Sequence, residues 1–118
     1  MIDSILTSIK KLLGIAEEYD SFDSDIIMHI NSVFMTLNQL GIGPSEGFMI
    51  EDDFATWNDY IDIDAEPDKK QLLSAIKTYI YLKVKLIFDP PLSSAVMEAI
   101  KQSITEAEWR LNIESKNE

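Results

Sequence analysis

The chain has 118 residues, of which 46% are hydrophobic, so it has the size and composition of one ordinary folded domain. It carries 21 acidic and 10 basic residues, for a formal net charge of −11, and it contains no cysteine. The negative charge argues against a function in nucleic-acid binding, because affinity for phosphate comes largely from lysine and arginine. The absence of cysteine excludes disulfides, thiolate metal sites and cysteine nucleophiles, and we expect a reducing, intracellular origin.

The negative charge is concentrated in the first half of the chain. Residues 1–60 hold 11 acids and two lysines, a balance of −9, whereas residues 61–118 hold 10 acids and eight bases, a balance of −2. The segment 1–14 lacks the uninterrupted apolar stretch and the cleavage site of a signal peptide, so we expect no leader. Lys83 and Lys85 interrupt the best apolar run, so we expect no membrane span.

Apolar residues at intervals of three and four predict two helices in the first part of the chain. The first is expected over residues 3–13, and Gly14 is suited to end it. The second is expected over residues 24–40, where the apolar residues fall on one arc and Gly41 is suited to a left-handed cap.

The stretch 45–67 is less regular. Its larger apolar residues stand three to four apart: Ile50, Phe54, Trp57 and Ile61. This spacing predicts a short helix that starts near Glu51, since acidic residues suit a helix N-terminus. The acidic run from Asp62 to Asp68 superficially resembles a calcium loop, but it lacks the central glycine and the closing glutamate, and it contains Pro67. We interpret that run as a solvated acidic turn.

Two longer helices are predicted in the second half. One begins near Asp68 and stops at the Asp-Pro-Pro sequence 89–91, because two prolines exclude helical continuation. With successive residues placed about 100° apart, its apolar arc spans about 200°. So wide an arc predicts neighbours on two sides, in a central core helix or a subunit contact. The last helix is expected to follow Ser93 and to end near Asn112.

Together these elements predict an all-α fold, a small bundle of four main helices with an irregular, partly helical middle segment. We expect a single domain over residues 1–113, followed by a polar tail at 114–118.

Few residues indicate chemistry. His29 is the single histidine, so neither a histidine-based dyad nor a metal site with a second histidine can form, and we interpret it as an ordinary surface or boundary residue. The sequence holds no glycine-rich phosphate loop, no G-x-S-x-G and no H-E-x-x-H. We therefore expect no enzymatic activity, no cofactor and no metal site.

Four residues stand on the unexpected side of their helices and are the candidate interface residues. Met28 and Met35 project opposite the apolar arc of 24–40, and Trp109 points away from the apolar stripe of the last helix. Methionine and tryptophan are common in interface cores, although a loop of the same chain that covers them would explain their positions equally well. Lys83 places a charge within an apolar arc, so it either reaches water along its neighbours or meets an acidic residue across an interface.

The last two predicted helices resemble a known family. The segments that carry the resemblance are Tyr79-Ile-Tyr-Leu-Lys-Val-Lys-Leu-Ile-Phe-Asp-Pro-Pro91, Ser93-Ser-Ala-Val-Met-Glu-Ala-Ile100 and Glu108-Trp-Arg-Leu-Asn112. They are similar to the head-to-tail connector proteins of long-tailed bacteriophages. The resemblance is strongest over residues 72–112; before them only the layout of helices is similar.

The resemblance implies a structural virion protein, an adaptor whose copies form a ring beneath the portal and extend the DNA channel towards the tail. The implied partners are further copies of the chain, the portal protein, and the next head-completion or tail protein. The implied location is the virion neck, after assembly in the host cytoplasm. DNA would pass through the ring without specific binding, because carboxylates repel phosphate, although plain solubility explains the charge equally well. The alternative is an acidic DNA mimic or inhibitor that binds a basic partner.

Overall fold

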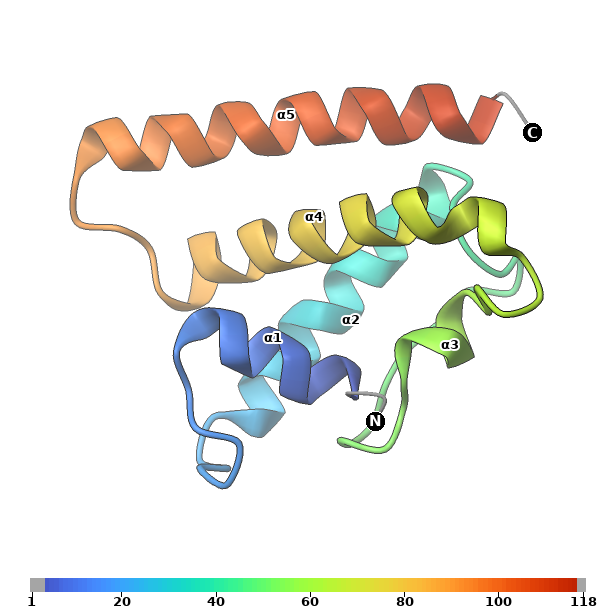
Figure 1. Cartoon of the computed structure of the whole chain (residues 1–118). Helices are drawn as coiled ribbons and strands as arrows, with labels where there is room; N and C mark the ends of the chain where they lie inside the picture. Colours follow the sequence, from blue (N-terminus) through green and yellow to red (C-terminus); the bar gives the residue numbers. More distant parts are fainter. Residues whose placement is uncertain (1–3, 117–118) are drawn as a thin grey trace.

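The chain folds into helices joined by turns and short loops, in a computed structural model that describes residues 4–116 (Figure 1). The elements are α1 (Ile5–Leu13), α2 (Asp23–Gln39), α3 (Trp57–Tyr60), the 3₁₀ turn η1 (Pro67–Lys69), α4 (Lys70–Phe88) and α5 (Ser94–Lys116). Over the described residues, the extended pairing is limited to an isolated bridge between Ser4 and Thr56. The predicted all-α bundle with four main helices is confirmed.

Helix α4 is the centre of the bundle. It packs against α5 on one side and against α1 and α2 on the other. Figure 1 shows α5 running across the top of the molecule, antiparallel to α4. The wide apolar arc of this segment therefore has neighbours on two sides, as the sequence predicts.

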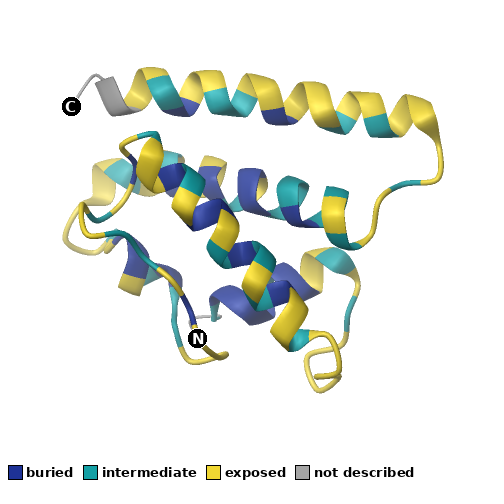
Figure 2. Cartoon of the chain, turned by 180° about the vertical axis from the view of Figure 1, so that it is seen from behind, coloured by how far each residue is buried: buried dark blue, intermediate teal, exposed yellow. Residues whose placement is uncertain are grey.

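The core is built mainly from three helices. Its fully buried members include Ile5 and Ile9 of α1, Ile26, Ile30 and Leu37 of α2, and Ile76, Tyr79, Ile80 and Val84 of α4. Helix α5 contributes less, because only Ile104 and Leu111 of its described side chains are buried. Figure 2 shows the consequence, since most of α5 is exposed along its length.

The predicted short helix in the middle of the chain begins at Trp57 rather than near Glu51, so that expectation is wrong. Thr56 starts α3 through a capping box, in which its hydroxyl accepts from the Asp59 amide and the Asp59 carboxylate accepts from the Thr56 amide at 2.8 Å. Before it the chain bends at 51–53, and the residues next to α3 pair with the start of α1, where the Ile5 amide donates to the Ala55 carbonyl at 2.9 Å. Phe54 is 82% exposed, so its helical spacing from Ile50 and Trp57 does not reflect a shared buried face.

The outer boundaries also differ from the expected ones. Ser4 caps α1 by accepting from the Thr7 amide, so the helix begins at Ile5. Of the predicted range 3–13, residue 3 lies outside the described part. Helix α5 continues to Lys116, beyond the expected end near Asn112, because Leu111 is buried against the core and no proline or glycine follows it. Residues 114–116 of the expected tail are therefore helical, and 117–118 lie outside the described residues.

Lys10 is a buried cation that joins α1, the following loop and α2. Its side chain is 3% exposed, and its Nζ donates to the carbonyls of Glu17 at 2.9 Å and Tyr19 at 2.8 Å. The same Nζ lies 2.9 Å from Oδ1 of Asp23, the first residue of α2. Lys10 thus makes two hydrogen bonds to carbonyls, and its contact with Asp23 is an ion pair. The Lys10 side chain therefore helps to fix the loop 14–22 to the bundle.

Gly43 holds the loop after α2 against α3. Its φ is +87°, and a Cβ built on it would lie 2.7 Å from the Tyr60 ring. That ring packs on Phe34 and Phe48, with centroid separations of 4.7 and 5.1 Å. Only glycine fits this backbone conformation and this close approach together.

Replacing Tyr60 with phenylalanine is expected to leave the free energy of unfolding at pH 7 unchanged or to raise it by up to about 1 kcal/mol. The Tyr60 hydroxyl is buried without a hydrogen-bond partner among the described residues, and burial raises its pKa. Because the pKa of Tyr60 in the folded state lies above the ordinary value near 10, the unfolded chain loses this proton first as pH rises. Ionisation of Tyr60 in the unfolded state therefore leaves the free energy of unfolding unchanged below about pH 10 and lowers it above that pH. Urea unfolding at pH 7 and 10.5 should therefore show a smaller alkaline loss in Tyr60→Phe than in the parent.

The matched control is Tyr79→Phe, because the Tyr79 hydroxyl donates to Glu108 Oε2 at 2.7 Å. Removing that donor is expected to cost about 1–3 kcal/mol at pH 7. Equal losses in the two variants would show that the Tyr60 hydroxyl also makes a stabilising bond.

Candidate functional site

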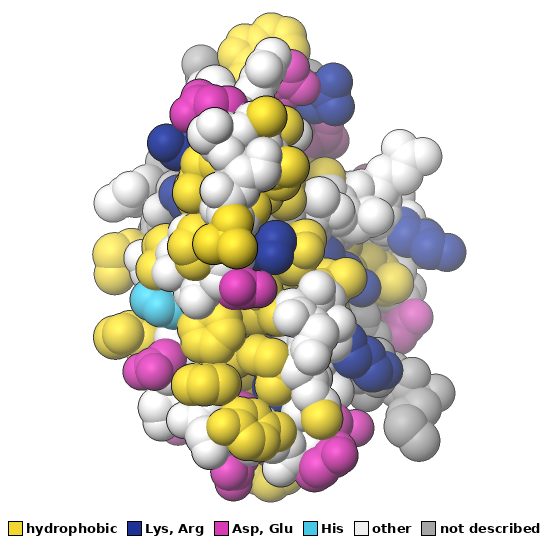
Figure 3. Space-filling view, turned by 90° about the vertical axis from the view of Figure 1, so that its left-hand side faces the viewer, with side chains coloured by type: hydrophobic (Ala, Val, Ile, Leu, Met, Phe, Trp, Pro, Cys, Tyr) yellow, Lys and Arg dark blue, Asp and Glu magenta, His cyan; other side chains and the backbone are white. Residues whose placement is uncertain are grey.

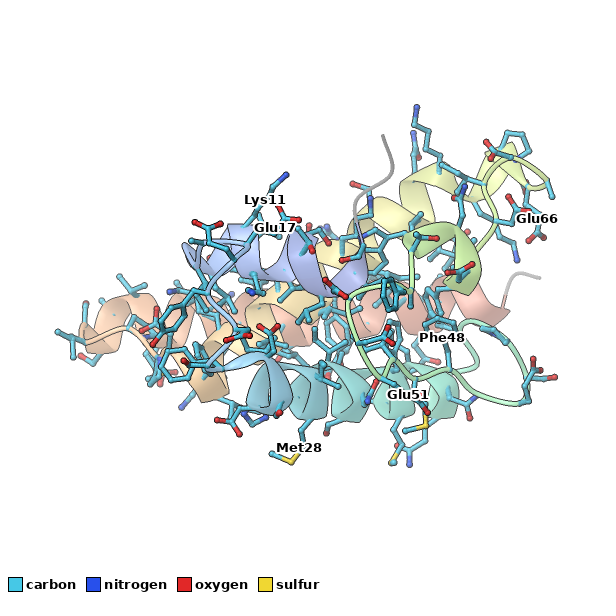
Figure 4. All side chains as sticks on the ribbon, turned by 90° about the horizontal axis from the view of Figure 1, so that it is seen from below. Lys11, Glu17, Met28, Phe48, Glu51 and Glu66 are labelled. Atoms are coloured by element: carbon cyan, nitrogen blue, oxygen red, sulfur yellow. The ribbon has the colours of Figure 1, made fainter. Side chains whose placement is uncertain are left out.

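A groove of about 550 Å³ lies between α2 and the loop segment 46–49. We call it the methionine groove; its apolar lining consists of Met28, Phe34, Met35, Phe48 and Met49. The rim methionines Met28, Met35 and Met49 are 60%, 66% and 67% exposed. Phe34 is buried and forms the floor with Phe48, at a centroid separation of 5.1 Å. In Figure 4, Met28 projects outward from α2.

The loop wall of the groove is fixed to α2 by two asparagines. The Asn31 side chain donates to the Ile50 carbonyl at 2.9 Å and accepts from the Ile50 amide at 2.7 Å. The Asn38 amide donates to the carbonyl of Pro44 at 3.1 Å. Both ends of the segment are thereby held, so the groove is formed in the isolated chain, while unbranched methionines leave its rim adaptable.

The structure brings Met28 and Met35 together and supplies Met49, which the sequence did not indicate. No loop covers the two helical methionines, so the covering-loop explanation does not hold for them. A role for them in an interface stays a prediction. The sequence did not indicate Met49 because its segment has no helical periodicity. The adjacent apolar pair Phe48-Met49 in a polar loop was the feature that could have indicated a contact surface there.

Trp109 lies on the outer side of α5, away from the core, and it is not part of the methionine groove. It is 65% exposed, and Ile113, one turn further along, is 40% exposed. The side chains on the opposite side of the helix, Ile104 and Leu111, are buried. Trp109 and Ile113 therefore form an exposed apolar ridge, which we call the α5 ridge.

Replacing Trp109 with alanine is expected to change the free energy of unfolding by less than about 0.5 kcal/mol, because an exposed side chain contributes little to folding. The matched control is Trp57→Ala. Trp57 is buried and its indole N–H donates to Ser8 Oγ at 2.9 Å, so that change should cost about 3–5 kcal/mol. Urea unfolding followed by circular dichroism measures both. Comparable losses would place Trp109 in the folding core and remove it from the interface candidates.

Lys83 has its acidic neighbour within the chain. Its Nζ lies 3.7 Å from Glu108 Oε2 of α5 and 5.6 Å from the centroid of the Tyr79 ring. Burial, together with the hydrogen bond and the charge of Glu108, raises the pKa of the Tyr79 hydroxyl. These contacts fix α5 to α4, so the polar residues on the facing sides specify how the outer helix docks. A contact between Lys83 and another chain remains a prediction.

A third apolar surface lies at the end of the molecule where α4 ends and α5 begins. The rings of Tyr19 and Phe22 are 5.6 Å apart, and those of Phe22 and Phe88 are 5.3 Å apart. Leu92 and Val96 are exposed beside the turn between the helices. Figure 3 shows hydrophobic side chains gathered over much of this face. The sequence reading did not predict this surface, because it joins segments that only the fold brings together.

Over the described residues, no group of three or more histidine, cysteine and acidic side chains is arranged to hold a metal ion. The Asp62 carboxylate instead accepts from the amides of Asp64 and Ala65, at 3.0 and 3.3 Å, as expected of an acidic turn. In the described part of the chain, no helix has the length and apolar character to cross a lipid bilayer.

Comparison with known proteins identifies the family. The family model described as phage connector protein matches residues 5–118, which extends the resemblance from the last helices to nearly the whole chain. No curated protein and no solved structure matches the chain. The helical fold, with exposed apolar surfaces, is compatible with a structural role in joining phage head and tail. The chain therefore belongs to the phage connector protein family.

Proposed function

We propose that this connector is a ring-forming adaptor of the phage neck. Its copies assemble beneath the portal, extend the DNA channel towards the tail, and offer a platform to the next head-completion or tail protein. The protein would be assembled in the host cytoplasm and would function in the neck of the virion.

The observation that carries the proposal is the presence of two unlike apolar surfaces on a small connector chain, the methionine groove on α2 and the α5 ridge. Contacts between unlike patches repeat in one direction and close into a ring when the rotation per subunit divides a full turn. The apolar face at the α4–α5 turn leaves a further surface for a different partner, such as the portal.

The charge supports a channel lining that DNA does not adhere to. With a net charge of −11 the assembled ring would present a strongly negative surface. Phosphates are repelled at short range by carboxylates, and few lysines or arginines are present to release counterions. A low-affinity wall lets DNA slide during packaging and ejection.

The test is reconstitution of the purified chain with its portal, followed by negative-stain imaging. We expect an added ring of density coaxial with the portal, and no retention of duplex DNA by the free chain at physiological salt. A portal that stays bare in the presence of excess connector would overturn the proposal. A tight one-to-one complex with a basic enzyme would favour the inhibitor alternative instead.

A further inference from the structure

We propose that the α5 ridge of one subunit inserts into the methionine groove of the next. This contact rests on the proposed ring and names the two surfaces that would close it. Trp109 is the anchor, Ile113 supports it, and Met28, Met35 and Met49 form the rim that receives them.

The two surfaces are complementary in shape. The groove is a preformed hollow of about 550 Å³ whose aromatic floor consists of buried Phe34 and partly buried Phe48. The ridge is convex, because Trp109 and Ile113 are exposed on the side of α5 opposite buried Ile104 and Leu111. An indole buries about 150–250 Å² when it is enclosed, which makes it an effective anchor for a narrow contact.

The chemistry of the rim also suits tryptophan. Thioether sulfur makes favourable contacts at the edges of aromatic rings, and unbranched methionine side chains adjust to the shape of what they enclose. Phe34 and Phe48 add ring contacts at the floor.

A subunit cannot place its own ridge in its own groove. The groove lies on α2 and the ridge on α5, and α4 packs between these two helices. Each subunit therefore offers one donor surface and one acceptor surface on different sides, which is the requirement for a head-to-tail contact.

Charge favours this pairing over a contact between two grooves. Of the described residues that line the groove, one is charged, Glu46, and the groove belongs to the half of the chain with a balance of −9. Two such halves facing each other would repel. The half that carries α5 has a balance of −2, with exposed Arg110 next to Trp109 in sequence and exposed Glu106 one turn before it. A contact between the groove and the ridge therefore meets less repulsion than a contact between two grooves.

The first experiment mixes two variants that each lose one surface, Met35→Glu in the groove and Trp109→Glu in the ridge. Each alone should self-associate at least about tenfold more weakly than the parent, with unchanged helix content, because interface anchors carry most of the binding energy. Mixed one to one, they should form dimers and nothing larger, since one intact groove and one intact ridge remain per pair. Leu12→Glu is the control; Leu12 is exposed on α1, outside both surfaces, and its variant should assemble like the parent.

The second experiment uses the absence of native cysteine. Ser32 lines the groove, and Glu106 lies exposed one turn before Trp109. Under oxidation in the portal-bound assembly, the double variant Ser32→Cys with Glu106→Cys should give a ladder of linked chains. Ser32→Cys paired with Ala65→Cys, at an exposed turn outside both surfaces, is the control and should give none.

The outcomes separate the contact from the ring. Rings that persist in both glutamate variants, or Ser32→Cys alone linking to itself as readily as the double variant, would overturn the contact and leave the ring standing. A parent chain that stays monomeric even with its portal would overturn both.

Discussion

Replacing Lys10 with methionine is expected to lower the free energy of unfolding by about 3 kcal/mol, because removing one partner leaves a charge uncompensated in a largely buried site. The Asp23 carboxylate would lose its ion pair at 2.9 Å, and the carbonyls of Glu17 and Tyr19 would lose their donor. Methionine keeps the length and apolar stem of the side chain, so the loss reports on the ammonium group. Urea unfolding at neutral pH gives the value.

The control for Lys10 is Lys101→Met on the exposed side of α5. Lys101 pairs with Glu98 at 3.7 Å between exposed side chains, and such surface pairs contribute about 0–1 kcal/mol. Asp23→Ala should cost less when Lys10→Met is already present, since both changes remove the same ion pair. A loss from Lys10→Met no larger than that from Lys101→Met would refute the assigned role of Lys10.

Replacing Gly43 with alanine is expected to cost about 3 kcal/mol, from a left-handed backbone and from overpacking against an aromatic cluster. The new Cβ would stand 2.7 Å from Cε1 of Tyr60, in a ring held between Phe34 and Phe48. To remove this clash, the loop after α2 would have to move away from α3. Thermal and urea unfolding both measure the loss.

Gly14→Ala separates the two causes. Gly14 has a φ of +81°, close to that of Gly43, but a Cβ there would have no atom within 4 Å beyond its own chain neighbours. It should therefore cost only the backbone term, about 1–2 kcal/mol. If both variants lose the same free energy of unfolding, the Tyr60 ring moves aside without cost, and its close approach to Gly43 does not contribute to the loss.

Periodicity predicts most of the fold, because a buried helix face repeats every three to four residues. The wide apolar arc of the segment that forms α4 predicted neighbours on two sides, in a central core helix or a subunit contact, and α4 is the central helix. The same reasoning failed between Ile50 and Trp57, where a short spacing match outweighed the capping signal of Thr56 and Asp59. Four apolar residues are too few to distinguish a helix from an extended segment.

The buried role of Lys10 was beyond the reach of the sequence. A helical wheel places it on a face of α1, but its ligands are backbone carbonyls of a loop whose path depends on the fold. The Tyr60 contact of Gly43 is similar, because it joins segments whose approach only tertiary packing determines.

The candidate contact surfaces were predicted in part. Helical geometry alone indicates that Met28, Met35 and Trp109 point away from the core, and they are exposed. It could not show that the loop 46–49 turns two of them into the wall of a groove. For Lys83 the sequence could not show which chain supplies an acidic neighbour, and the structure places Glu108 of its own α5 beside it.

The most direct test of the central claim is the mass of the purified chain by sedimentation across a concentration series, alone and with its portal. A head-to-tail connector predicts a rise from the 13.4 kDa monomer to one discrete closed multiple, which appears at lower concentration when the portal is present. A chain that sediments as a monomer at every concentration, and does not join the portal, would contradict the account.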